Sequence, residues 1–303
     1  MQGNIIRRAR LKMKRVAIHV WEGIRPSFHV AVGSRRLRIR ATPGTGWLLS
    51  WTPDWKTELI DGLLSRRPGL FVDIGANMGQ TLFDYCASRH GQGYVGFEPS
   101  SRCVDHLRQI IADNRLDDCT IVPTALADQA RPLTFHVVDE TDPGATLLKE
   151  VEPLKQRRQM IVPAYRFDDV VDDLTGGREV SLIKVDVEGA EHMVIEGMAA
   201  TLRQRRPLIV CEVLNCDVNA DMDAHERRNQ RLIDALEAAA YKVARINKSS
   251  DGRHVTGLTE VSGFPSIIYT RENAPDCDYL FVPGDVSFAE LVSFKPPGGP
   301  AAR

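Results

Sequence analysis

The sequence predicts an α/β fold in which a mainly parallel sheet carries helices on both faces. Short apolar runs recur along the chain and alternate with segments of helical character, which is typical of sheets built from βαβ units. The first run ends in a glycine turn that opens a helix. Several later runs end in an acidic residue, as expected where the carboxyl ends of parallel strands surround a ligand.

The expected core consists of seven strands with helices between most of them. The strands cover 70–74, 93–97, 119–123, 181–186, 207–213, 241–246 and 264–270. The helices lie near 79–90, 100–113, 189–204 and 224–240. A loop without a helix joins the last two strands, so we expect them to pair antiparallel. Two extra strands, at 133–138 and 160–162, are expected between the third and fourth core strands.

An N-terminal extension precedes this core. Residues 28–32 and 37–40 alternate around Gly33 and predict a β-hairpin. Residues 53–64 predict a helix, with Thr52 as its cap and Pro53 at its first position. We therefore expect a basic segment, hairpin and helix packed on the core at 1–66, the main domain at 67–290, and a disordered tail at 291–303.

Charge and cysteine content limit the partners and the compartment. The net charge of the 303-residue chain is −1, so nucleic acid is not an expected partner. Residues 1–40 hold eleven Arg or Lys and one acid, and 5–18 could form a basic helix. That helix predicts peripheral contact with an anionic membrane, with a solvated terminus as the alternative. Scattered cysteines without a C-x-x-C pair, and no apolar run of membrane-spanning length, predict a cytoplasmic protein.

The turn after the first core strand favours a cationic ligand. A dinucleotide turn has the pattern G-x-G-x-x-G, but here the first glycine is replaced by Asp73, with Gly75 and Gly79 following. An acid at this position repels a pyrophosphate. It suits S-adenosylmethionine, which carries an ammonium and a sulfonium and has no phosphate. The two glycines allow close backbone approach and tight packing of helix on strand.

A second acid, Glu98, ends the next core strand, 25 residues after Asp73. An acid at about this spacing accepts hydrogen bonds from a ribose diol. Pro99 and Ser100 then begin a helix, with Ser100 as a plausible N-cap. The alternative is a generic doubly wound fold whose glycines serve only packing.

A third group of acids follows the fourth and fifth core strands. Asp186 ends the fourth strand, Glu191 lies in the first turn of the next helix, and Glu212 ends the fifth strand. Because the carboxyl ends of parallel strands meet at one edge, we expect Asp73, Glu98, Asp186 and Glu212 around one crevice.

Three motifs resemble those of the FkbM family of S-adenosylmethionine-dependent O-methyltransferases. They are D-I-G-A-N-x-G from Asp73, F-E-P-S from Phe97, and I-K-V-D-V-E-G-A-E-x-x-V-I-x-G from Ile183. The resemblance extends from about residue 54 to 283. It implies a Rossmann-like class I methyltransferase fold, whose members methylate hydroxyls of sugars, glycolipids and polyketide-like natural products. It also implies that Asn77 and Pro99, within these motifs, belong to the cofactor site.

Methyl transfer to a hydroxyl needs a group that removes the hydroxyl proton. Asp186 is the first candidate, and its alternative role is to hold the cofactor ammonium. Glu188 could orient the acceptor or cap the next helix, and His192 has the intrinsic pKa of a base. Asp186, Glu188 and Glu212 could also bind a divalent metal such as Mg²⁺, although their spacing assigns no metal site.

The adenine is expected near Ala125 and Asp128, after the third core strand. Together these features predict an O-methyltransferase that acts on a hydroxyl of a sugar, glycolipid or natural product. The alternatives are an N- or C-methyltransferase on a natural product, or a non-catalytic partner protein that binds the nucleoside.

Overall fold

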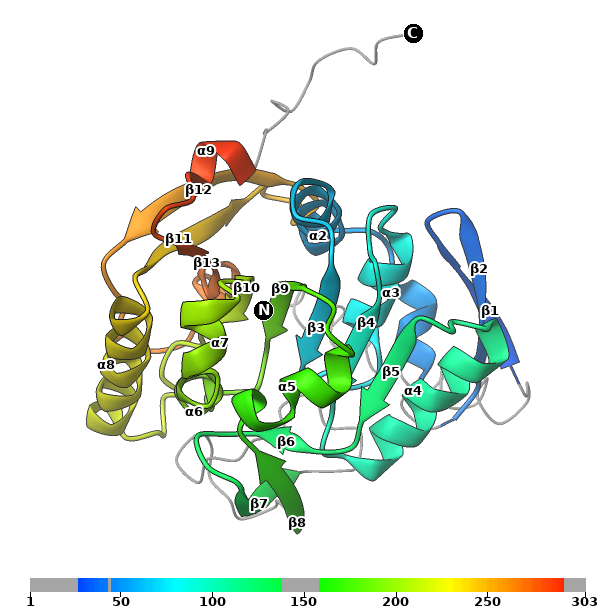
Figure 1. Ribbon diagram of the computed structural model, residues 1–303, viewed down its shortest axis with the longest axis horizontal. Coiled ribbons are helices and arrows are strands. Elements are labelled where there is room, and N and C mark those ends of the chain that lie inside the picture. The colour runs from blue at the N-terminus through cyan, green and yellow to red at the C-terminus, as the bar shows by residue number, and fades with distance from the viewer. Residues whose placement is uncertain (1–26, 43–44, 138–157, 292–303) are drawn as a thin grey trace, which may run out of the picture.

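A single eight-stranded sheet forms the centre of the protein (Figure 1). The structure is a computed structural model that describes residues 27–42, 45–137 and 158–291. The strand order is β12-β11-β13-β10-β9-β3-β4-β5. These strands are β3 (Leu70–Ile74), β4 (Tyr94–Phe97), β5 (Cys119–Val122), β9 (Val180–Val185), β10 (Leu208–Glu212), β11 (Tyr241–Lys248), β12 (Val255–Val261) and β13 (Asp278–Pro283).

The five strands from β10 to β5 are parallel, and β13 runs antiparallel to both of its neighbours. Their side chains alternate between two apolar clusters, one on each face. Phe71 belongs to one cluster, whereas Leu70 and Val72 belong to the other. A sheet buried on both faces needs apolar residues at nearly every position, which explains why the strands read as continuous apolar runs.

Helices cover both faces of the sheet, which confirms the predicted fold class. Helices α2 (Trp55–Arg66), α3 (Gln80–Ala87) and α4 (Ser101–Asn114) contribute to the cluster that contains Phe71. Helices α5 (Phe167–Thr175), α6 (Glu191–Glu196), α7 (Ala199–Gln204) and α8 (Met222–Ala238) cover the other face. The single helix expected at 189–204 is therefore two helices, and α5 was not expected.

The seventh strand predicted at 264–270 is wrong. This segment makes only one isolated bridge, between Cys216 and Ile268, and Ile267 to Tyr269 are exposed. Pro265 removes a backbone donor from the run, which weakens it as a strand in the interior of a sheet. The strand that pairs with β10 and β11 is instead β13, whose residues 279–283 are all buried. With β12 at the edge, the sheet has eight strands rather than seven.

The two extra strands expected between the third and fourth core strands are present. They are β7 (Arg131–Val137) and β8 (Arg158–Tyr165), and together with the short β6 (Ala125–Leu126) they form a three-stranded sheet of order β6-β8-β7. Its apolar residues, among them Phe135 and Val137, pack with Ala190 and Met193. The small sheet therefore lies beside the segment that leads into α6 (Figure 1).

The N-terminal hairpin is formed by β1 (Ser27–Val32) and β2 (Arg35–Arg40), as predicted. Its inward residues join the cluster under α2, α3 and α4. Arg40 forms an ion pair of 2.8 Å with Asp113 on α4. Helix α2 begins two residues later than expected. Its cap is Asp54 rather than Thr52, and the Asp54 side chain accepts a hydrogen bond from the backbone N–H of Lys56.

Two predictions concern the ends of the chain. The basic helix predicted at 5–18 and residues 292–303 of the predicted tail lie outside the described residues. The division at residues 66 and 290 stays a prediction. Across the ranges that the structure describes, no helix combines the length and apolar character needed to cross a bilayer. Helix α9 (Phe288–Leu291) and the short 3-10 helices η1 (Gly46–Ser50) and η3 (Ala274–Asp276) complete the elements.

Candidate active site

The turn between β3 and α3 is closed by backbone contacts that require glycine at residue 75. Gly75 has a φ of +90°, and a Cβ atom there would lie 1.9 Å from the carbonyl oxygen of Asp186. The N–H groups of Gly75 and Ala76 both donate 3.0 Å hydrogen bonds to the carbonyl of Phe97. The turn is therefore held against the ends of both neighbouring strands, β4 and β9.

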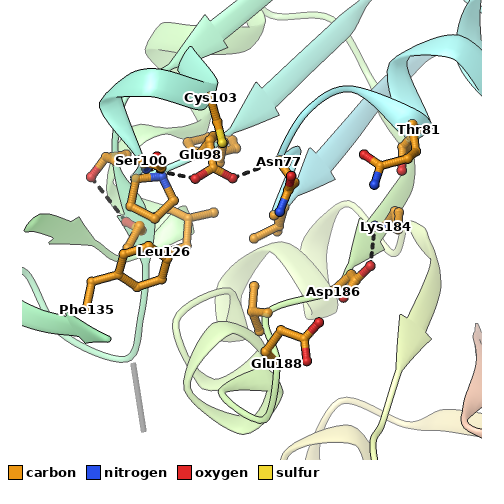
Figure 2. Close-up of a pocket in the computed structure, with 18 of the residues that line it drawn as sticks. Asn77, Thr81, Glu98, Ser100, Cys103, Leu126, Phe135, Lys184, Asp186 and Glu188 are labelled. Carbon is orange, nitrogen blue, oxygen red and sulfur yellow. Dashed lines mark hydrogen bonds and ion pairs between the residues drawn. The ribbon is translucent and has the colours of Figure 1, made fainter. Parts of the chain in front are cut away.

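Glu98 directly follows β4, and the residue is only 5% exposed (Figure 2). The N–H of Asn77 donates a 2.8 Å hydrogen bond to one carboxylate oxygen, and the N–H of Ser100 donates a 2.7 Å bond to the other. Burial nevertheless raises the pKa of Glu98 to about 7. Each oxygen can accept a further hydrogen bond, so the group remains available to hydroxyl donors.

A first cavity opens at the carboxyl ends of β3, β4 and β9. It encloses about 980 Å³, part of it open to solvent. One side is apolar and is formed by Phe97, Cys103, Leu126, Phe135 and Val137. In Figure 2, Phe135 and Leu126 lie on the side of Ser100, whereas Thr81 and Lys184 lie on the opposite side. The cavity thus has an apolar end, a carboxylate at Glu98 and a charged end.

Asp73 does not line this cavity, in contrast to its predicted role as ligand of the cofactor ammonium. Its side chain is fully buried, accepts a 2.6 Å hydrogen bond from the Tyr94 hydroxyl, and lies 3.7 Å from the Lys184 ammonium. The register of β3 and β9 pairs Asp73 with Lys184, so this lysine places a positive charge beside the Asp73 carboxyl group. Asp73 therefore lies behind the lining residues and contributes to the site through its contact with Lys184.

Lys184 also binds Asp186, at 2.9 Å. Burial disfavours both charges, but Asp186 and Asp73 outweigh it and raise the pKa of Lys184. Lys184 in turn outweighs burial and holds the pKa of Asp186 below its ordinary value. Asp186 lines the first cavity and is ionised at neutral pH, so it is suited to bind a cation and is a poor proton acceptor.

Glu188 has a backbone conformation that is rare for a residue with a side chain, with a φ of +54°. Burial, together with the neighbouring Asp186, Glu212 and Glu191, raises the pKa of Glu188 to about 9. Glu188 is the one side chain among the described residues that lines both the first cavity and a second one. Strained residues in rare conformations are often found at functional sites.

The second cavity lies between β10, α6 and α8 and encloses about 1040 Å³, part of it open to solvent. Its lining is rich in polar side chains: Glu191, His192, Glu212, Asn215, His225, Arg228, Asn229 and Tyr269. Burial, together with Arg231 and Arg228, lowers the pKa of His192 to about 4. His192 is therefore neutral at pH 7, and its Nδ1 has no hydrogen-bond partner among the described residues. It faces the second cavity and not the first.

Of the remaining residues that were predicted for the cofactor site, some line the first cavity and others lie outside it. Pro99 and Ala125 line the first cavity with Asn77 and Gly75. Gly79 does not, and a Cβ atom there would lie 2.9 Å from the Leu107 side chain, so this glycine lets α3 pack on α4. Asp128 also lies outside the lining, and its nearest basic partner is Arg131 at 3.9 Å.

Among the residues of the first cavity that sequence reasoning missed are Lys56, Phe135 and Val137. The alternation along 131–137 places Phe135 and Val137 on one face and was a usable signal. No pattern in the sequence distinguishes Lys56, which lies in α2 and precedes the glycine turn.

No group of three or more His, Cys, Asp or Glu residues in the described ranges is arranged to hold a metal ion. This includes Asp186, Glu188 and Glu212, the set considered for Mg²⁺. Burial and the nearby Asp186 carboxylate raise the pKa of Glu212 to about 8 and act in the same direction on Glu188. The arrangement of the described side chains does not support a metal site at this set.

A doubly wound sheet with a glycine turn after its first strand, a buried acid after the next and an apolar wall beside them is typical of α/β domains that bind nucleosides. The sequence pattern of the methyltransferase FkbM domain matches residues 73–243, more than half of the chain. The chain belongs to the FkbM methyltransferase family.

Individual relatives are more distant. Methyltransferase FkbM from Methylobacillus flagellatus KT is 14% identical with a TM-score of 0.41, over 71% of this chain and 43% of that chain. An O-methyltransferase from Bacillus cereus, solved in complex with SAH, is 12% identical with a TM-score of 0.40, over 75% and 79%. The nonribosomal peptide synthetase asqK of Emericella nidulans is 38% identical over 58 residues, which are 19% of this chain and 2% of that protein.

Proposed function

We propose that the protein transfers the methyl group of S-adenosylmethionine to a hydroxyl group of a sugar, a glycolipid or a related natural product. The observation that carries this proposal is the junction of the two cavities at Glu188. One cavity has the features of a nucleoside site, and the other is polar and separately open. A group that reaches both stands where a donor and an acceptor would meet.

The first cavity suits S-adenosylmethionine in shape and charge. Its apolar end, with Phe135 and Leu126, can hold a flat base, and Glu98 can accept hydrogen bonds from the ribose hydroxyls. At the charged end, Asp186 is ionised and can bind the ammonium group. The ionised Asp186 at this end favours a cation, which a pyrophosphate-bearing cofactor would not provide.

In this proposal Glu188 is the general base. The bound cofactor supplies an electrophilic methyl group on a sulfonium, which becomes a neutral thioether after transfer. Glu188 takes the proton of the acceptor hydroxyl as the new oxygen–carbon bond forms. With a pKa of about 9, Glu188 is protonated at neutral pH when no cofactor is bound. The positive charge of a bound cofactor lowers the pKa of Glu188, so Glu188 can lose its proton and act as a base once the cofactor is present.

The acceptor occupies the second cavity. Its lining offers side-chain amides, a neutral imidazole and a guanidinium, from Asn215, Asn229, His192 and Arg228. Such a mixture can donate to and accept from several hydroxyl groups at once, as a sugar requires. His192 orients the acceptor in this arrangement. All six cysteines are free and buried, which suits a reducing compartment such as the cytoplasm.

Calorimetry with S-adenosylmethionine tests the cofactor assignment first. We expect saturable binding, whereas no binding, or tighter binding of NAD, would contradict the proposal. Transfer of labelled methyl groups to a panel of saccharides and glycolipids tests the acceptor. The label should appear in O-methyl ethers that resist base hydrolysis. Label on nitrogen or carbon would favour the alternative of an N- or C-methyltransferase.

A further inference from the structure

We propose that Lys56 binds the carboxylate of the cofactor's amino-acid part, so that the N-terminal helix α2 completes the cofactor site. This inference rests on the proposed function. It concerns a residue outside the segment that matches the FkbM domain, which begins at residue 73.

Lys56 is the second residue of α2, and it lines the first cavity together with Gln80 and Thr81 of α3. Helix α2 is fixed there by its cap and by Thr57, whose hydroxyl donates a 2.7 Å hydrogen bond to the buried carboxylate of Asp84. Lys56 itself is half-buried, with its ammonium 5.9 Å from the centre of the Trp55 ring. The position of the lysine is therefore set by the fold.

Two lysines line the first cavity, and they differ in what their ammonium groups already bind. Lys184 is occupied by Asp186 and Asp73. Lys56 has no carboxylate among the described residues within 4.0 Å of its ammonium. Burial disfavours its charge, but Asp84, Asp54 and Asp186 outweigh burial and raise the pKa of Lys56. A charged ammonium with unused donors thus lines the cavity, whereas the ammonium of Lys184 is already held by two carboxyl groups.

The geometry matches an amino acid joined to a nucleoside. Glu98 and the apolar wall lie at one end of the cavity, and Thr81 lies at the other, on the side of Lys184 (Figure 2). The ammonium and the carboxylate of an amino acid lie on one carbon, so their partners must lie close together. Asp186 and Lys56 supply opposite charges at this end, and each influences the pKa of the other.

The test compares two unreactive ligands in a binding experiment. S-Adenosylhomocysteine keeps the carboxylate, and its decarboxylated analogue keeps the ammonium alone. Wild-type protein should bind the first more tightly by about 10-fold or more, as expected for a charge-assisted contact. Lys56→Gln should remove this preference by weakening only S-adenosylhomocysteine, and Lys56→Arg should retain most of it. Lys242→Gln, a lysine outside both cavities, is the matched control.

Equal weakening of both ligands by Lys56→Gln would overturn the inference, since it would show a structural role. Unchanged affinity for both would overturn it as well. If wild-type protein binds neither ligand, the proposed function itself is wrong. If wild-type protein binds both equally, only the carboxylate assignment fails. Thermal unfolding of each variant checks that the fold is intact, and Lys56→Met provides a second neutral variant.

Discussion

Glu188 lines both cavities and lies in an environment that disfavours its charged form. Its φ of +54° strains the backbone, and its burial and three neighbouring carboxylates act against an ionised glutamate. The folded protein keeps this side chain protonated up to a pH of about 9, whereas an unfolded chain releases the proton near the ordinary glutamate pKa. The contribution of Glu188 to the free energy of unfolding therefore becomes less favourable as pH rises through this window.

Glu188→Gln should raise the melting temperature of the ligand-free protein by an amount that grows from pH 5 to pH 9, while it lowers methyl transfer. The amide resembles the protonated acid in shape but does not titrate, so the variant does not lose stability as pH rises. The amide also cannot accept a proton from a hydroxyl, so methyl transfer falls. Thermal unfolding at pH 5, 7 and 9 measures the effect. The control is Glu237→Gln on the exposed side of α8. A pH-independent difference would contradict the expected titration.

Asp73 is a residue whose place in the chain was predicted correctly but whose side-chain contacts were not. The sequence places an acid at the end of the first core strand, but the direction of its side chain depends on the residues that neighbouring strands bring beside it. Tyr94 and Lys184, far apart in the sequence, meet Asp73 in the folded protein. Glu98, by contrast, lies beside the cavity as its spacing predicted, while its contact with a ribose stays a prediction.

At the scale of elements, the turn between β3 and α3 has little tolerance for a side chain. Gly75→Ala should destabilise the protein and abolish cofactor binding, because its Cβ atom would meet the backbone of Asp186. Gly177→Ala is the matched control, since Gly177 also has a positive φ, of +80°, but has no atom within 4 Å of the added Cβ. Melting temperatures and calorimetry with S-adenosylmethionine distinguish the two. Equal losses would show that backbone strain alone decides.

Six of the seven predicted core strands are present, because each is a short apolar run with clear breaks on both sides. The error at 264–270 and the omission of β13 have one cause. Both segments contain apolar runs of similar length, and apart from Pro265 the local sequence does not tell which of them is buried between β10 and β11. The predicted helix at 189–204 divides near Gly197, where a Cβ atom would lie 2.1 Å from the carbonyl oxygen of Ala127. That contact is made by a residue distant in sequence, so no local pattern indicates it.

At the scale of the whole molecule, the sheet depends on its last strand. Deletion of residues 278–303 should yield insoluble or unfolded protein, because it removes the strand that joins β10 to β11 and leaves each of them with one unpaired edge. Deletion of 292–303 should leave the fold intact, since β13 and α9 are retained. Solubility and circular dichroism measure both outcomes. A soluble, folded chain that ends at residue 277 would show that β10 and β11 can pair without β13.

The central place of β13 also bears on how the protein is made. Ribosomes release the chain from its N-terminus, so β3, β4, β5, β9 and β10 are available for pairing while the strand that joins β10 to β11 is still being synthesised. During that interval the open edge of β10 exposes backbone donors and acceptors to other chains. The sheet is completed only when residue 283 has emerged, so the pairing of β13 is the step that removes this exposed edge from the nascent protein.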